Sequence, residues 1–214
     1  VIEMAKANGF KSLDEIKEHF ANMSHTYKTP KRKRVDKIDS GLMLEVPIVD
    51  LHLGKLSFDD EVGEGYNCEI ARTRFNEIID GVIEEVENKK FEKIIFPIGN
   101  DFFNYNNIDG TTTKGTRQDN DLKWRQLYLT GVDMLIDGIT KLSTSLKAPV
   151  DVFYVMGNHD SQNGFYATSY VNAWFRNDEN ITVDITMSPR KYIEFGNVLI
   201  GFAHGDKEKK RIDT

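Results

Sequence analysis

Hydrophobic and polar positions follow two periods along this chain. Short apolar runs of strand length recur at residues 45–50, 91–98, 150–156, 181–185, 191–195 and 197–203. Longer segments with apolar residues three or four positions apart predict helices over residues 67–90, 121–146 and 165–175. In the first of these helices the expected buried stripe is Ile70, Phe75, Ile78, Ile79, Val82 and Val86. Strands that alternate with helices indicate an α/β layered domain.

Two segments outside this alternation have their own character. Residues 1–22 predict two short helices, and the basic run that follows at 28–37 is typical of a solvated, flexible linker. Contact of this run with nucleic-acid phosphate is the alternative interpretation. We therefore divide the chain into a helical arm with a basic linker, 1–40, and an α/β domain, 41–214. The polar stretch 104–120 predicts a long loop beside the strand ends.

Composition limits the classes of function. Apolar residues make up 39% and charged residues 29%, as in ordinary globular proteins, and the apolar runs are too short to cross a bilayer. The single cysteine, Cys68, cannot form an intramolecular disulfide, which favours a cytoplasmic location. The net charge of −6 argues against a generally basic nucleic-acid binder. An acidic protein of this kind would need metal ions to meet an anionic substrate.

Four apolar runs each end in side chains that can bind metal. The residues are Asp50 and His52, then Asn100 and Asp101, then Asn158, His159 and Asp160, and finally His204 and Asp206. Each cluster alone has a simple explanation as a turn, a helix cap or a core histidine. Ligands of open α/β sheets bind outside the carboxyl ends of the strands, so we expect the four clusters to converge there.

Carboxylate, imidazole and amide groups suit Mn²⁺, Fe or Zn²⁺. Asp50 and His52 would share one side of an extended chain, because alternate residues of a strand face the same way. A carboxylate that bridges two cations about 4 Å apart forms the clamp used for phosphoryl displacement.

The motifs DLH, GND, GNHD and AHGD, in this order and each after a strand, resemble those of the calcineurin-like metallophosphoesterases. That superfamily includes the SbcD-type nucleases. The resemblance covers residues 44–206, and the GNDFFN variant with the polar loop behind it is most similar to a phage-encoded branch. It implies a layered β-sandwich flanked by helices and a cytoplasmic hydrolase with two divalent metal ions, Mn²⁺ above all.

The resemblance also implies a role for each site residue. Asp50 and His52 would hold the first metal, Asp101 would bridge, and the second metal would be held by Asn158 and His204. His159 would act as a catalytic acid instead of a ligand, oriented by Asp160. Water activated by the two metals would then attack the phosphate ester.

Two departures from the family pattern affect these expectations. Asn100 stands between the glycine and the aspartate of the second motif, and the family's last motif, Gly-His-x-His, is missing. We therefore expect the chain to be a piece of a longer protein whose C-terminal part is missing here; a naturally degenerate site is the alternative. DNA is the expected substrate. Nucleotides or phosphoproteins, and a non-catalytic binding module with a decayed metal site, remain open alternatives.

Overall fold

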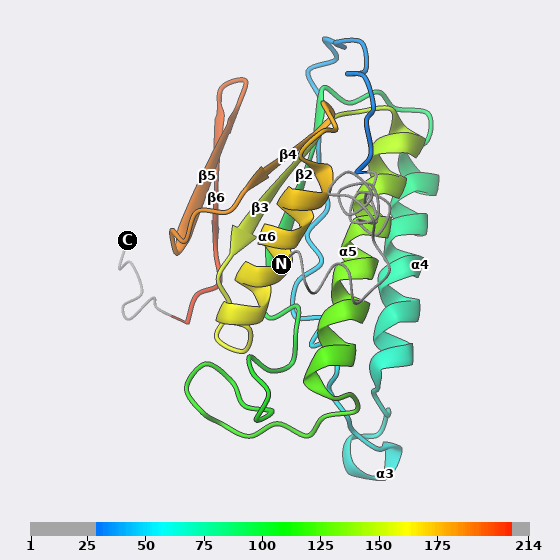
Figure 1. Ribbon diagram of the computed structural model, residues 1–214. Coiled ribbons are helices and arrows are strands. Elements are labelled where there is room, and N and C mark those ends of the chain that lie inside the picture. Colours follow the sequence, from blue (N-terminus) through cyan, green and yellow to red (C-terminus); the bar gives the residue numbers. More distant parts are fainter. Residues whose placement is uncertain (1–28, 207–214) are drawn as a thin grey trace, which may run out of the picture.

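The computed structural model describes residues 29–206 (Figure 1). The helices expected within 1–22, and the histidines His19 and His25, lie outside the described residues. Within residues 29–206, no helix has the length and apolar character needed to cross a membrane.

The centre of the fold is a sheet of four parallel strands in the order β1-β2-β3-β4. Helices connect the strands, so the predicted α/β class is confirmed. All four strands point the same way, and the segments that follow them therefore lie at one edge of the sheet. The strands are β1 (Met43–Glu45), β2 (Lys93–Gly99), β3 (Val150–Val155) and β4 (Ile181–Asp184).

Helices cover one face of this sheet (Figure 1). Alternation along β2 sends Ile94, Phe96 and Ile98 into the large core beneath them. The buried stripe predicted for the first long helix is wrong at Ile78, because the Ile78 side chain is exposed. The helices are α3 (Asp59–Val62), α4 (Cys68–Val86), α5 (Trp124–Leu146) and α6 (Ser161–Phe175).

A hairpin packs on the other face of the sheet. Its strands, β5 (Arg190–Phe195) and β6 (Val198–Ala203), are antiparallel. Phe202 of the hairpin lies against Phe153 of β3, with ring centroids 4.8 Å apart. This smaller core, which also contains Ile95, makes the fold three-layered: helices, sheet and hairpin.

Two element boundaries differ from the prediction. The strand expected at 45–50 is regular only from Met43 to Glu45, because Pro47 has no N–H to continue the ladder. The helix expected from residue 165 already begins at Ser161, directly after the polar cluster that ends β3. The earlier start places the first turn of α6 against that cluster.

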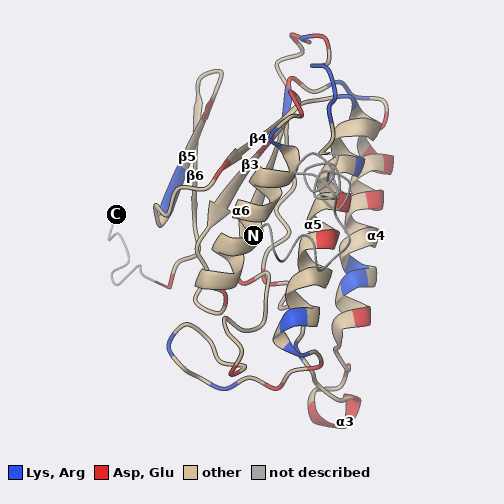
Figure 2. Ribbon diagram, in the orientation of Figure 1, with Lys and Arg blue, Asp and Glu red and all other residues tan. Residues whose placement is uncertain are grey.

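The structure describes residues 29–37 of the basic segment. These residues are attached to the domain by hydrogen bonds. The guanidinium of Arg32 donates to the buried carboxylate of Asp178 at 2.5 Å. The side-chain oxygen of Asn180 accepts from the backbone N–H of Val35 at 2.7 Å. Because these partners directly precede β4, the segment is fixed at the amino ends of the strands (Figure 2). The flexible linker predicted from its composition is therefore wrong for this part of the chain.

Replacement of Arg32 tests this attachment. Arg32→Ala leaves the Asp178 carboxylate buried without its cation, so we expect a loss of about 1–3 kcal/mol in the free energy of unfolding. Denaturant titration measures the change. The control is Lys33→Ala, which removes an exposed cation of the same segment and should change stability by less than about 0.5 kcal/mol. Equal effects of the two variants would contradict a specific attachment.

Candidate metal centre

Two loops at the carboxyl edge of the sheet run side by side and position the first site residues. The loop after the β1 segment bonds to the loop after β2: His52 N–H donates to Asp101 O at 3.0 Å, and Leu53 N–H to Phe102 O at 2.8 Å. These bonds hold the two loops together beyond the end of the sheet, where the regular ladder has stopped.

The backbone of these loops is left-handed at the candidate ligands. Among residues 29–206, five residues other than glycine have positive φ, and four of them are Asp50, His52, Asn100 and Asp101. Such a conformation costs roughly 1–3 kcal/mol per residue and is concentrated at functional sites in proteins. The prediction that Asp50 and His52 share one side of an extended strand is therefore wrong. The left-handed turn still brings His52 Nε2 to 3.8 Å from Asp50 Oδ1.

Asp101 lies at the centre of the cluster. Its side chain is buried, and its two oxygens face different segments: Oδ1 accepts from the backbone N–H of His159 at 2.7 Å, and Oδ2 lies 2.9 Å from His204 Nε2. His204 follows β6, so the hairpin layer contributes to the centre together with the sheet. The predicted convergence is confirmed, although the fourth cluster arrives from the opposite layer and not from the parallel sheet.

Gly157 makes the close approach to Asp101 possible. A β-carbon at this position would overlap the Asp101 carboxylate and would lie 2.6 Å from Asp160 Oδ1. The glycine of the GNHD motif is therefore required by space, since every other residue would push the central carboxylate aside.

The partner of His159 differs from the one that the resemblance implies. His159 Nδ1 lies 2.8 Å from the backbone oxygen of Asn104, while Asp160 accepts from the backbone N–H of Phe103 at 3.1 Å. Within the described residues no hydrogen bond joins Asp160 to His159. The orienting role belongs to the Asn104 carbonyl, which sequence reasoning missed. Because this carbonyl occupies Nδ1, Nε2 is the nitrogen left to face a ligand.

Among residues 29–206, two groups of side chains have the spacing of metal ligands. The ligand atoms of His52, Asp101 and His159 lie within 4.8 Å of one another, and so do those of Asp50, Asp101 and His204. Asp101 belongs to both groups, and oxygen with imidazole nitrogen is a donor set that Mn²⁺, Fe and Zn²⁺ accept.

The state of His52 fits a metal ligand. Its Nδ1 is buried and has no hydrogen-bond partner within the part of the chain that the structure describes. Burial, reinforced by the neighbouring His159, lowers the pKa of His52 from its ordinary value. A neutral imidazole with an unpaired nitrogen is the form that binds a cation.

Asn158 and Asp206 occupy the margin of the centre. Asn158 accepts from Thr113 N–H through its backbone oxygen, and within residues 29–206 its side-chain amide makes no hydrogen bond. Asp206 Oδ1 lies 3.4 Å from His204 Nδ1, on the side of the ring that faces away from Asp101. Both lie next to the expected ligands, and the assignment of Asn158 to a metal stays a prediction.

Comparison of the chain with protein-family models, with curated proteins and with solved structures finds no match in any of the three.

The buried Asp160 predicts how stability depends on pH. Complete burial raises the pKa of Asp160 from 3.8 to about 7, against the opposing effect of the Phe103 hydrogen bond, and the charge of Asp101 adds to the rise. A raised pKa contributes stability that is present below the unfolded value and is lost as pH rises through the folded value. The metal-free wild type should therefore lose stability between these two pKa values.

Asp160→Asn keeps an acceptor for Phe103 N–H but cannot ionise. In EDTA we expect the variant to be more stable than the wild type at pH 8, on the order of 1–4 kcal/mol. Its advantage should grow from about pH 4 to pH 7 and then level off. Denaturant midpoints across this range measure the difference, with the exposed Asp133→Asn as a control that should show no such trend. Parallel curves for Asp160→Asn and wild type would contradict a buried titrating carboxyl group.

Proposed function

We propose that this protein is a metal-dependent phosphoesterase with a two-cation centre at the carboxyl edge of its sheet. The observation that carries the proposal is the position of Asp101, whose ligand oxygens lie within 4.8 Å of a ligand atom of His52 on one side and of Asp50 and His204 on the other. A carboxylate in that position can bridge two cations, the arrangement used to displace an oxygen from phosphorus. The two Asp101 oxygens face different segments of the chain, so each of them could meet a cation.

The finer fold assignment is part of the same proposal. A calcineurin-like metallophosphoesterase would have a second β-layer on the sheet face that lacks helices, and the β5–β6 hairpin occupies that face. The order of the four motifs and their arrival at one centre support this assignment. We propose Mn²⁺ as the first cation to test, and DNA as the first phosphodiester substrate.

Bound cations would supply an activated water and would neutralise charge on the phosphate. The residues of the chain supply the rest. His52 and His204 arrive from opposite layers with Asp101 between them. The Asn104 carbonyl fixes the His159 ring through Nδ1. Nε2 is then left to protonate the leaving oxygen. The His159 ring stands edge-on to His52, with centroids 4.6 Å apart, which restricts its rotation.

The basic segment does not support a DNA substrate at this centre. Its described residues bind at the amino ends of the strands, and the candidate centre lies at the carboxyl ends (Figure 2). Arg32 in particular is already paired with Asp178. Phosphate contacts must therefore come from residues nearer to Asp101.

Asp101→Asn tests the bridge. An amide cannot share negative charge between two cations, so we expect less Mn²⁺ at both sites and loss of hydrolysis of bis(p-nitrophenyl) phosphate, while the circular dichroism spectrum is preserved. Metal content after dialysis and turnover are measured together. Asp137→Asn on the exposed face of α5 makes the same chemical change away from the centre and should alter neither value. Two retained cations and wild-type turnover in Asp101→Asn would refute the proposal.

His159→Asn separates an acid from a ligand. If His159 donates a proton, the variant should keep its Mn²⁺ content and lose roughly 10²–10⁴-fold in turnover. The loss should be smaller for a substrate with a good leaving group, such as p-nitrophenolate, than for an alkyl ester, because a good leaving group needs no proton. Loss of metal in step with turnover would instead identify His159 as a ligand in the group with His52 and Asp101.

A further inference from the structure

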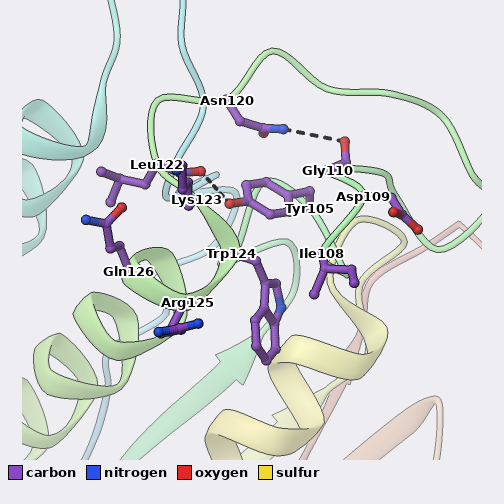
Figure 3. Close-up of a pocket in the computed structure, with 10 residues that line it drawn as sticks. All are labelled: Tyr105, Ile108, Asp109, Gly110, Asn120, Leu122, Lys123, Trp124, Arg125 and Gln126. Carbon is purple, nitrogen blue, oxygen red and sulfur yellow. Dashed lines mark hydrogen bonds between the residues drawn. The ribbon is translucent and has the colours of Figure 1, made fainter.

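A large open groove lies beside the candidate centre. Its volume is about 1020 Å³, and it lies between the polar loop and the start of α5 (Figure 3). This volume is at the upper limit of small-molecule pockets, which hold about 300–1,000 Å³. The lining residues are Tyr105, Ile108, Asp109, Gly110, Asn120 and residues 122–126.

The groove is joined to the centre by a short network of hydrogen bonds. Asn163, in the first turn of α6, accepts from Trp124 Nε1 at 2.9 Å and donates to the Tyr105 backbone oxygen at 2.7 Å. Tyr105 directly follows Asn104, whose carbonyl holds His159. Asn163 stands three residues after Asp160, a rise of roughly 5 Å along a helix. Asn163 and Tyr105 therefore connect Trp124 at the groove to the backbone that holds His159.

Of the two aromatic residues in the lining, Tyr105 is buried, and Trp124 is partly exposed with its polar atom already used. The indole N–H of Trp124 is used by Asn163, and the hydroxyl of Tyr105 donates to the Leu122 carbonyl at 2.6 Å. Tyr128 stacks on Trp124 with the ring planes 22° apart, which holds the indole in position. A ligand of the groove would therefore meet Trp124 through stacking and not through a hydrogen bond to its indole N–H.

The charged residues at the groove favour an anion. Lys123 and Arg125 flank Trp124, and within residues 29–206 neither makes an ion pair; Asp109 is the acid of the lining. The charged residues of the lining therefore sum to a positive charge, whereas the net charge of the whole chain is −6. Figure 2 shows the basic start of α5 beside the polar loop.

We propose that this groove holds unpaired nucleotides of a nucleic-acid strand whose phosphodiester lies at the Asp101 centre. The inference rests on the proposed phosphoesterase function and names its substrate class. A partly exposed aromatic ring near cations that make no ion pair within the described residues is a combination that binds single strands without sequence preference: bases stack on the ring and phosphates meet the cations. A phosphorylated protein would offer the anion but no row of bases to stack.

Fluorescence of Trp124 tests the proposal without any catalytic step. The chain has two tryptophans, so Trp174→Phe leaves Trp124 as the single reporter. Titration with an eight-nucleotide oligothymidylate in EDTA should quench this fluorescence to saturation. In the same background, Lys123→Ala with Arg125→Ala should weaken binding by at least roughly ten-fold and should reduce the slope of log K against log salt by about 1.4, which is 0.7 for each lost contact on a single strand.

The matched control removes two exposed lysines at the opposite end of the molecule. Lys89→Ala with Lys90→Ala makes the same change in net charge after α4 and should leave affinity and slope unchanged. Absence of quenching, equal losses in the two double variants, or equal quenching by inorganic tripolyphosphate would each overturn the proposal. If bis(p-nitrophenyl) phosphate is hydrolysed while the oligonucleotide does not bind, the groove inference fails and the phosphoesterase proposal stands. If the oligonucleotide binds as expected and the ester is not hydrolysed, the phosphoesterase proposal fails instead.

Discussion

The candidate centre depends on the position of one buried carboxylate. Asp101 receives a backbone N–H from the segment after β3 and faces the His204 imidazole from the hairpin, so it joins two layers of the fold. Its position is possible only because its own backbone is left-handed and Gly157 has no side chain. The local strain is stabilised by the surrounding core, where Phe102 and Phe103 are fully buried on the helix side.

Much of this arrangement could be predicted from the sequence, because apolar runs and polar strand ends are local signals. The α/β alternation, the helices that became α4 and α5, and the meeting of Asp50, His52, Asp101, His159 and His204 all follow from such signals. Other features depend on contacts between distant segments. Nothing local indicates that Asn104 would offer its carbonyl to His159, although the asparagine-rich NYNN run after β2 marks the loop as unusual.

The basic segment shows the limit of reasoning from composition. A run of lysine and arginine beside a proline has the composition of a solvated linker, but Asp178 and Asn180 lie 145 or more residues further along the chain and bind it to the start of β4. Composition reports charge and not the location of the partner. The two ends of the sheet consequently differ: at one end Arg32 is engaged by Asp178, and at the other Lys123 and Arg125 make no ion pair within residues 29–206 and line a groove.

The glycines of α5 connect helix stability to the candidate centre. A β-carbon at Gly131 would overlap the Phe103 ring, and one at Gly138 would lie 2.9 Å from the Phe75 ring. Alanine is favoured over glycine by about 1 kcal/mol within a helix, so α5 is locally weaker than it could be at both positions. Phe103 is also the residue whose N–H meets Asp160. An alanine at Gly131 would therefore gain helix propensity and disturb Phe103, so this glycine couples the packing of α5 to the position of Asp160.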